Sequence, residues 1–331
     1  MLKIFRGLKV GTAHAQRLMS LLTLVCGFFM MWGSSRGAQV NSANNQELRA
    51  KAVEIDPLIP DGRNNGKVVV AAGRFFTPDL LEDEFIKAAS FLILKRHVEM
   101  YQWKERSLGP DRTPRYDTEW VEGQVDFFKF KETAGHENPL MRYEGFTRRA
   151  PISTFGAFNG EGLLKSVTQL MPLTLSADLL KDPSVQIVEN KILIPRNSGN
   201  ANPDTPEIGD MRVWYEVLPT GDYTVLTRQV DERNLVGASS GYAMVMRFGR
   251  LSPDELFEAE NKATEKVSDG LLYVGGALFF IGLYSVLSPL AAHMDLRPKV
   301  NLQGAPALAL VCAMVSAVAV VIFFIVGRVN S

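Results

Sequence analysis

The chain has 331 residues, with 36 basic and 36 acidic side chains, so its formal net charge is zero. A chain without an overall positive field has no electrostatic drive towards a polyanion, and we therefore expect no nucleic-acid partner. Hydrophobic residues make up 46% of the sequence, and many of them gather in three segments that carry almost no charge.

These three segments predict transmembrane helices, because a helix needs about 20 apolar residues to cross the hydrocarbon core of a bilayer. They cover residues 18–35, 271–292 and 304–327. The first one follows a basic leader, residues 1–17, and this combination also occurs in secretory signal peptides. Signal cleavage requires small residues three and one positions before the cut, and the best candidate, after Ala38, has Arg36 at the first of them. The sequence therefore favours an uncleaved anchor.

The basic residues that flank the three segments predict their orientation. Four lie in the leader, two in the loop of residues 293–303, and Arg328 stands alone in the tail of residues 328–331. Placing the leader and the loop in the cytoplasm satisfies the positive-inside rule. The large domain, residues 36–251, is then extracytoplasmic.

This domain is predicted to be mainly β, of the α+β class. Alternating or β-branched runs mark seven strands, at residues 67–73, 91–103, 124–131, 185–195, 210–218, 223–230 and 242–248. The turn residues PTGD, at 219–222, predict a hairpin between the fifth and sixth of these strands. Residues 161–170 have the spacing of a short helix. The polar loop 197–210, rich in proline and glycine, is a candidate boundary between two subdomains.

Residues 252–270 predict a juxtamembrane helix. Ser252 is its expected N-cap, Pro253 fills the first helical position, and Glu255 completes a capping box. The apolar stripe continues to Leu271, so the helix is expected to run on towards the second span, with Gly270 as a candidate hinge. Such a helix would couple the domain mechanically to the bilayer, and the simpler alternative is a passive stalk.

The stretch RHVEMYQWKE, residues 96–105, is the densest in reactive side chains. In a strand, side chains alternate between the two faces. One face would carry His97, Glu99, Tyr101 and Trp103, and the other would carry Arg96, Val98, Met100 and Gln102. The first face suits a satisfied polar cluster, a contact with lipid or protein, or an acid/base pair. One histidine and one carboxylate without a nucleophile make a weak catalytic signal.

A metal site or a general base is the alternative suggested by His136 and Glu137. Zinc sites need three or four ligands, and the domain holds only two histidines, His97 and His136, and no cysteine. An extracytoplasmic hydrolase or metal-dependent enzyme would therefore have to recruit Glu99 or Glu137. No phosphate-binding loop, dinucleotide fingerprint or metalloprotease motif occurs in the sequence. We expect no enzymatic activity, no cofactor and no metal.

Four motifs, in their order along the chain, resemble the transmembrane protein 43 family, also called LUMA. They are RHVEMYQWKE, YDTEW at 116–120, GHENPL at 135–140 and GDMRV at 209–213. The resemblance extends from about Lys67 to Phe248 and continues into LSPDELFEAE. The residues that carry it are Glu99, Met100, Tyr101, Gln102, Trp103, Glu119, Trp120, Gly135, His136, Asn138, Pro139, Gly209, Asp210 and Arg212.

The resemblance implies an N-terminal anchor, a large luminal or extracytoplasmic domain and a C-terminal cluster of spans. Eukaryotic members of the family belong to the endoplasmic reticulum and inner nuclear membrane, where they are regarded as organisers of membrane protein complexes rather than enzymes. This sequence has two predicted C-terminal spans where those members have more, so partner binding through the missing region does not carry over. We expect a bacterial inner-membrane protein with a periplasmic domain. If the source is eukaryotic, we expect the protein in the endoplasmic reticulum or the inner nuclear membrane.

Taken together, these features predict a non-enzymatic, membrane-anchored scaffold whose β domain binds membrane lipid or other membrane proteins. Aromatic rings suit the interfacial zone of a bilayer and cations suit anionic headgroups. The expected contact residues are Trp103, Trp120, Phe127, Phe128 and Lys129. Small residues in the last two spans also allow close helix packing, either within the chain or in a homo-oligomer. They are Gly275, Gly276, Gly282, Ala309, Ala313 and Ala317.

Overall fold

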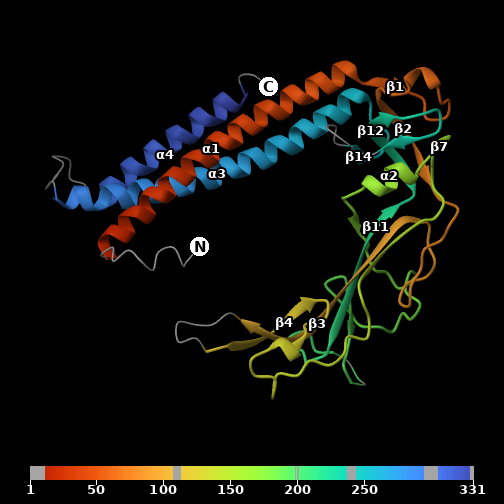
Figure 1. The fold of residues 1–331 in the computed structure, drawn as a ribbon, viewed down its shortest axis with the longest axis horizontal. Helices are drawn as coiled ribbons and strands as arrows, with labels where there is room; N and C mark the ends of the chain where they lie inside the picture. Colours follow the sequence, from red (N-terminus) through yellow and green to blue (C-terminus); the bar gives the residue numbers. More distant parts are fainter. Residues whose placement is uncertain are drawn as a thin grey trace. The chain divides into compact units, whose positions relative to one another are not determined.

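The computed structural model describes residues 12–106, 113–197, 199, 201–236, 244–293 and 305–328. The chain divides into a helical unit, within residues 1–51 and 252–331, and a β unit of residues 52–251 (Figure 1). Most of the predicted basic leader lies outside the described residues. The loop 293–303 and the tail 328–331 lie almost entirely outside them.

The helical unit consists of α1 (Thr12–Lys51), α3 (Pro253–His293) and α4 (Ala305–Arg328). Helices α1 and α3 run antiparallel, since Arg49 near the end of α1 pairs with Asp254 at the start of α3. Two helical stretches, Ala15–Lys51 and Pro253–Leu287, are long and apolar enough to cross a membrane, and Val311–Ile325 is a shorter apolar helix. The predicted capping box forms, because the Ser252 amide donates to the Glu255 carboxylate at 2.8 Å.

Both long helices continue beyond the predicted spans. Helix α1 extends to Lys51, so the predicted domain start at residue 36 lies inside it and the β unit begins at Ala52. Helix α3 passes Gly270 without interruption, so the juxtamembrane helix and the second predicted span are one element. Polar facing pairs hold the extended halves together, including Asn45 with Asn261 at 2.6 Å.

Glycines allow the helices to approach each other closely. A Cβ atom at Gly282 would lie 2.6 Å from Cα of Leu24, and one at Gly27 would lie 2.7 Å from the carbonyl oxygen of Gly275. Gly276 lies against Val320 of α4. The predicted glycine contacts therefore form within the chain. The alanine stripe of α4 is different, because Ala313 and Ala317 are exposed, while Cys312 and Ser316 are buried.

The β unit contains two seven-stranded sheets whose strands alternate along the chain. The first sheet comprises β1 (Val53–Ile55), β2 (Val68–Phe76), β6 (Thr154–Phe155), β7 (Phe158–Asn159), β12 (Gly221–Gln229), β13 (Leu235–Val236) and β14 (Val245–Phe248). The second comprises β3 (Phe91–Arg106), β4 (Arg115–Glu122), β5 (Phe146–Arg149), β8 (Met171–Pro172), β9 (Ile187–Val188), β10 (Lys191–Ile194) and β11 (Met211–Pro219). Short helices occur at η2 (Gly62–Asn64), η3 (Phe127–Lys129) and α2 (Glu161–Ser166).

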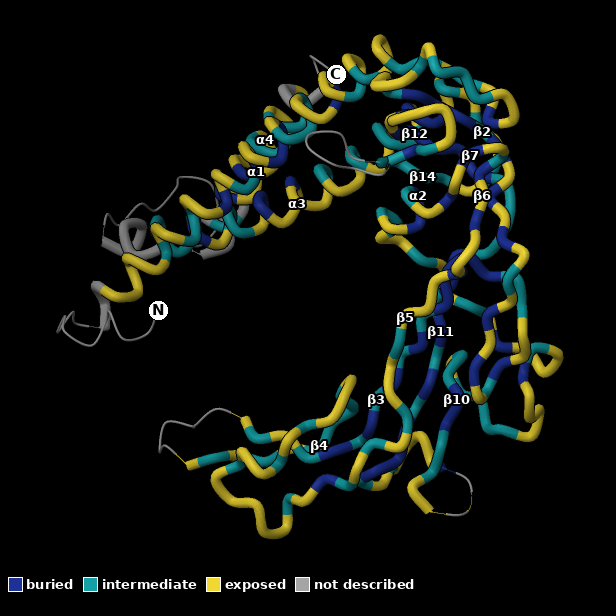
Figure 2. Tube along the Cα trace, turned by 45° about the vertical axis from the view of Figure 1, so that its right-hand side comes forward, coloured by how far each residue is buried: buried dark blue, intermediate teal, exposed yellow. Residues whose placement is uncertain are grey.

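The β unit has two hydrophobic cores, and the first also takes in Leu92 and Ile93 of β3 from the second sheet. The first core is built around Phe75, Phe155 and Tyr223, with Leu163 of α2 packed into it. The second core contains Val98 and other buried side chains of β3, β10 and β11. Figure 2 shows the buried positions of these strands in dark blue. The mainly-β prediction is confirmed, and the strands predicted at 67–73, 91–103, 210–218 and 223–230 correspond to β2, β3, β11 and β12.

The predicted hairpin at residues 219–222 is wrong, because β11 and β12 lie in different sheets. β11 pairs antiparallel with β3, placing Trp214 opposite His97. β12 pairs antiparallel with β2, placing Tyr223 opposite Gly73. The PTGD turn thus carries the chain from one sheet to the other. Val213 and Val217 of β11 belong to the second core, whereas Leu218, next to the turn, already packs in the first core with Tyr223 and Val225 of β12.

The loop 197–210, the candidate subdomain boundary, lies within one sheet. It joins β10 to β11, which are neighbours in the second sheet, with Ile192 opposite Val213. The chain crosses between the two sheets several times, and residues 52–251 form one compact unit.

Two predicted strands are also wrong. Residues 124–131 contain the turn η3, because the Asp126 carboxylate accepts from the Phe128 amide and the Gln102 side chain accepts from the Val125 amide at 2.9 Å. Residues 185–195 form a hairpin of β9 and β10, because Glu189 and Asn190 adopt positive φ angles of 50° and 61°, as in a type I′ turn. The predicted strand at 242–248 lies partly outside the described residues, and β14 begins at Val245.

Candidate functional site

The predicted alternation of β3 is confirmed. Arg96, Val98, Met100 and Gln102 are buried on the core side, and the residues between them are partly exposed on the opposite side. Strand pairing brings further polar and aromatic side chains of β4 and β11 to that opposite side, which we call the motif face. It consists of His97, Glu99, Tyr101, Trp103, Glu105, Tyr116, Thr118, Trp120, Glu122, Arg212, Trp214 and Glu216.

His97 lies at the centre of the motif face and joins three strands. Its Nδ1 atom is 3.0 Å from a Glu122 carboxylate oxygen on β4, and its Nε2 atom is 2.8 Å from a Glu216 oxygen on β11. The imidazole stacks on Trp214, with ring centroids 4.9 Å apart and an interplanar angle of 3°. A neutral imidazole donates from only one nitrogen, so only the imidazolium donates to both carboxylates.

Glu99 is not the partner of His97. Its carboxylate bonds to Arg212, whose guanidinium also lies over the ring of Trp120 at 4.6 Å. The acid/base pair considered from the sequence is therefore replaced by two separate clusters, one around His97 and one around Arg212. Both suit the interpretation as a satisfied polar cluster.

The pKa of Glu216 is lowered, chiefly because its carboxylate accepts a hydrogen bond from His97 and also because Lys95 lies nearby, while burial opposes the shift. A carboxylate with a lowered pKa stabilises the fold above its ordinary pKa of about 4.3, and this contribution is lost as the pH falls through the lowered value. Glu216→Gln should therefore destabilise the protein at pH 7. The difference from wild type should disappear as the pH is lowered towards 3.

Urea unfolding of wild type and Glu216→Gln between pH 3 and pH 7 measures this difference. A difference that stays constant across the range would show that the His97–Glu216 contact does not control the ionisation of Glu216.

His136 lies among aromatic rings. It stacks on Tyr116 with ring centroids 3.8 Å apart, meets Trp103 edge to face at 4.9 Å, and its Nδ1 atom is 3.2 Å from the Glu132 carbonyl oxygen. The Glu137 carboxylate instead accepts from the Gly135 amide at 3.1 Å, and backbone hydrogen bonds lower its pKa. Within the described parts of the chain, no group of three or more histidine, cysteine, aspartate or glutamate side chains is placed to hold a metal ion.

Asn138 acts as a short substitute for a neighbouring strand. Its side-chain oxygen accepts from the Trp103 amide at 2.7 Å, and its side-chain nitrogen donates to the Trp103 carbonyl oxygen at 3.0 Å. The side chain is buried, so removing it would leave two backbone groups without these partners. Asn138→Ala should reduce the free energy of unfolding by about 1–3 kcal/mol. Urea denaturation measures it, and a loss below about 0.5 kcal/mol would contradict the assignment.

Asp210 and Gly209 of the GDMRV motif hold the loop that precedes β11. The Asp210 carboxylate accepts from the Arg196 and Glu207 amides at 2.7 and 2.8 Å. The Gly209 amide donates to the Tyr101 carbonyl oxygen, and its φ of +98° requires glycine, since a Cβ there would also lie 2.7 Å from Pro139. Asn138 of GHENPL and Gly209 of GDMRV therefore both bond to the backbone of β3 as structural contacts.

The remaining motif residues are placed on the same part of the sheet. The Gln102 amide nitrogen donates to the Gly123 carbonyl oxygen at 2.7 Å, and Met100 belongs to the second core. Glu119 forms ion pairs with Lys104 and Arg106.

A buried ionic network beneath the motif face was not anticipated from the sequence. Arg96 donates to the fully buried carboxylate of Asp83 at 3.0 Å and to the Glu144 carbonyl oxygen at 2.9 and 2.8 Å. The Tyr215 hydroxyl donates to the same Asp83 oxygen at 2.6 Å, and burial raises its pKa. The signal available in the sequence was Arg96 itself, a charged residue at a position of β3 that points into the core.

Three of the five predicted contact residues lie together on one exposed turn. The rings of Phe127 and Phe128 stack at 4.3 Å, and Phe128 is 80% exposed. Lys129 is exposed beside them, and its ammonium pairs with Asp126 of the same turn at 3.2 Å. The Gln124 side chain joins this turn to the loop that carries Leu140, because it donates to the Pro139 carbonyl oxygen and accepts from the Met141 amide. Leu140 itself is 88% exposed. We call Phe127, Phe128, Lys129 and Leu140 the apolar tip.

The two predicted tryptophans are engaged on the motif face. Trp103 packs against His136, and Arg212 lies over Trp120. The apolar tip is therefore the more accessible part of the predicted contact surface.

Comparison with known proteins gives a consistent result. The family model described as "Transmembrane protein 43" matches residues 100–329. The proteins named "Transmembrane protein 43" from Rattus norvegicus and Homo sapiens are 28% and 27% identical to this chain over 307 and 306 residues. Each alignment covers 84% of this chain and 75% of the relative. No solved structure matches the chain.

Proposed function

Since the chain belongs to the transmembrane protein 43 family of membrane proteins, we propose that it is a non-enzymatic, membrane-anchored scaffold whose β unit binds lipid or other membrane proteins. The observation that carries this proposal is the apolar tip. Single exposed apolar residues are normal on protein surfaces, but two nearly fully exposed apolar side chains beside a stacked ring and a lysine favour a contact role.

The chemistry of the tip suits a membrane surface or a membrane protein. Removing phenylalanine and leucine side chains from water is favourable. It lowers the free energy by about 25 cal/mol per Å² of apolar surface that is buried. Lys129 pairs with Asp126, so the charges of this turn offset each other and the proposal rests on the apolar side chains.

The helical unit supports the anchoring part of the proposal. The stretches Ala15–Lys51 and Pro253–Leu287 supply two helices of sufficient length and apolarity, and α4 is proposed as a third span. With the first and second predicted basic clusters in the cytoplasm, the β unit is periplasmic in a bacterial inner membrane. This orientation predicts activity for an alkaline phosphatase fusion at Gly199, and an inactive fusion would overturn it.

A photo-crosslinking amino acid tests the role of the tip in the full-length protein. Benzoylphenylalanine in place of Phe128 should crosslink, in the native membrane, to lipid or to a defined set of membrane proteins. The same group in place of Leu58, which is 70% exposed on the same unit, is the matched control. Equal labelling from both positions would contradict a specific role for the tip.

The double variant Phe127→Ser/Phe128→Ser should reduce the lipid or protein that copurifies with the full-length protein by at least threefold. Loss of the aromatic contact area causes this decrease. The variant Leu58→Ser/Ile59→Ser removes two adjacent exposed apolar side chains elsewhere and should have little effect. Copurification that is unchanged in the tip variant would remove these residues from the account.

A further inference from the structure

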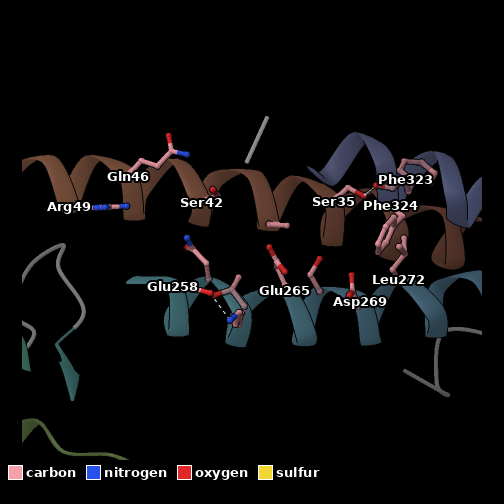
Figure 3. Close-up of a pocket in the computed structure, with 15 residues that line it drawn as sticks. Ser35, Ser42, Gln46, Arg49, Glu258, Glu265, Asp269, Leu272, Phe323 and Phe324 are labelled. Carbon is pink, nitrogen blue, oxygen red and sulfur yellow. Dashed lines mark hydrogen bonds and ion pairs between the residues drawn. The ribbon is translucent and has the colours of Figure 1, made fainter. Parts of the chain in front are cut away.

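The polar halves of α1 and α3 enclose a cleft of about 420 Å³ that reaches Phe323 of α4 (Figure 3). Arg49, which lines this cleft, pairs with Asp254, and the Ser35 hydroxyl donates to the Phe323 carbonyl oxygen at 2.7 Å. These bonds join helices of the same chain. A surface that is open to a second molecule lies in the β unit, at the outer edge of β4.

β4 is the longest strand at the edge of either sheet. It ends the second sheet, and its only strand partner among the described residues is β3. Its eight residues pair with β3 in a register without a bulge. The other strands with a single strand partner are two to four residues long, namely β1, β5, β7, β8, β9, β13 and β14. Proteins commonly shorten, bulge or cover such edges, because a long regular edge can pair with another strand.

The outer edge of β4 presents backbone groups that β3 does not use. The Tyr101 amide donates to the Asp210 carbonyl oxygen on the β11 side of β3, so the residues next to Tyr101, including Gln102, bond to β4. Gln102 pairs with Glu119, and the N–H and C=O groups of Thr118 and its even-numbered neighbours therefore point outwards. Within the part of the chain that the structure describes, these outward groups form no backbone hydrogen bond.

The sequence of β4 is nearly symmetric about Thr118. In YDTEW, an acid lies on each side of Thr118 and an aromatic residue lies beyond each acid. In an antiparallel pair of two β4 strands with a two-fold axis at Thr118, this residue faces its own copy and Tyr116 faces the second copy's Trp120. All three side chains lie on the motif face. Threonine pairs and aromatic pairs are among the cross-strand pairs that stabilise antiparallel sheets.

The acids on the opposite face of β4 are already neutralised within the hairpin. Asp117 would face the second copy's Glu119, and like charges directly opposite each other destabilise a sheet. Arg106 bonds to both acids of its own chain at 2.8 and 2.9 Å, and Lys104 bonds to Glu119 at 2.7 Å. Each copy therefore brings two acids and two bases to this face, and their charges cancel.

We propose that β4 is a dimerisation edge, at which two copies of this chain join their second sheets through antiparallel β4 strands centred on Thr118. The pairing adds about six backbone hydrogen bonds, which come from Tyr116, Thr118 and Trp120 of each copy. A two-fold interface requires a surface that is complementary to itself, and the near symmetry of YDTEW supplies it. The interface goes beyond the contact proposed for the apolar tip and does not depend on it.

Disulfide crosslinking of the full-length protein in its native membrane tests this register. Thr118→Cys, in a chain whose Cys26 and Cys312 are replaced by alanine, should give a covalent dimer on mild oxidation. The two copies of residue 118 have Cα atoms about 5.5 Å apart in this pairing, a separation that a disulfide spans. Glu122→Cys is the matched control on the same strand and face, because its two copies lie about 27 Å apart along the strands.

We expect at least tenfold more covalent dimer from Thr118→Cys than from Glu122→Cys. Equal yields from the two positions, or no dimer from Thr118→Cys, would overturn the proposal.

Thr118→Pro tests the outward backbone group without changing the bonds to β3. Proline removes the N–H that points outwards, and edge strands tolerate proline where the N–H faces solvent. Native mass spectrometry of the full-length protein should show at least tenfold less dimer relative to monomer for this variant than for wild type. Thr118→Val is the matched control, since it keeps the N–H and the branched shape but removes the hydroxyl that bonds to Tyr101 at 2.7 Å.

The Thr118→Val protein should retain the dimer, and circular dichroism verifies that both variants are folded. Loss of the dimer in both variants, or in neither, would contradict pairing through the backbone of β4. Crosslinking from Phe128 of the apolar tip is a separate readout, so failure of one proposal is distinguishable from failure of the other.

Discussion

Replacing Asp83 with alanine is expected to lower the free energy of unfolding by about 3–5 kcal/mol, a large fraction of the stability of a typical domain. Asp83 is fully buried and accepts hydrogen bonds from Arg96, Tyr215 and the amides of Phe85 and Ile86. Without its carboxylate, the Arg96 guanidinium is left beside the second core with a charge that has lost its buried partner. Urea unfolding monitored by tryptophan fluorescence measures the loss.

Glu84→Gln is the matched control for this prediction. Glu84 pairs with the same guanidinium but is mostly exposed, so its removal should cost less than about 1 kcal/mol. Equal costs for Asp83→Ala and Glu84→Gln would show that the buried network does not stabilise the β unit.

Replacing Gly282 with leucine is expected to separate α1 from α3 and to destabilise the helical unit by about 3 kcal/mol. A Cβ atom at this position would lie 2.6 Å from Cα of Leu24, so the clash involves backbone and cannot be relieved by turning a flexible side chain. Overpacking in a close-packed interior costs about 1–3 kcal/mol, and a backbone clash lies at the upper end of this range. Thermal unfolding of the helical circular dichroism signal in detergent measures the effect.

Gly33→Ala is the control for a glycine that does not mediate packing. A Cβ at Gly33 meets no described atom within 4 Å, so alanine should be neutral or should stabilise the helix by up to about 1 kcal/mol. If Gly282→Leu melts at the wild-type temperature, the close contact between α1 and α3 is not present in the protein.

Local patterns in the sequence predict the features that residues close together in the chain determine. The alternation of β3 and the capping box of Ser252 and Glu255 both depend on residues within one element. Periodicity and capping preferences describe such features directly.

Local patterns do not predict the structures that depend on contacts between residues far apart in the sequence. The PTGD turn resembles a hairpin turn, but long-range pairing with β2 and β3 separates β11 from β12. Residues 124–131 have strand-like alternation, yet the side chain of Gln102 captures the Val125 amide and a turn forms instead. In both cases a contact between residues far apart in the sequence outweighs the local preference.

The candidate site shows the same division. The faces of His97 and Glu99 follow from strand geometry, but the actual partners of His97, Glu122 and Glu216, depend on the register of three strands. Asn138 and Asp210 were identified through the family motifs, and the structure gives each of them hydrogen bonds that hold a loop.

Native mass spectrometry of the full-length protein, released gently from its own membrane without added lipid, tests the scaffold proposal most directly. The proposal predicts retained lipid, copurifying membrane proteins or a defined oligomer, with less retained material in Phe127→Ser/Phe128→Ser. A bare monomer from both wild type and variant would contradict it, and activity and metal assays centred on His97 and His136 would then take priority.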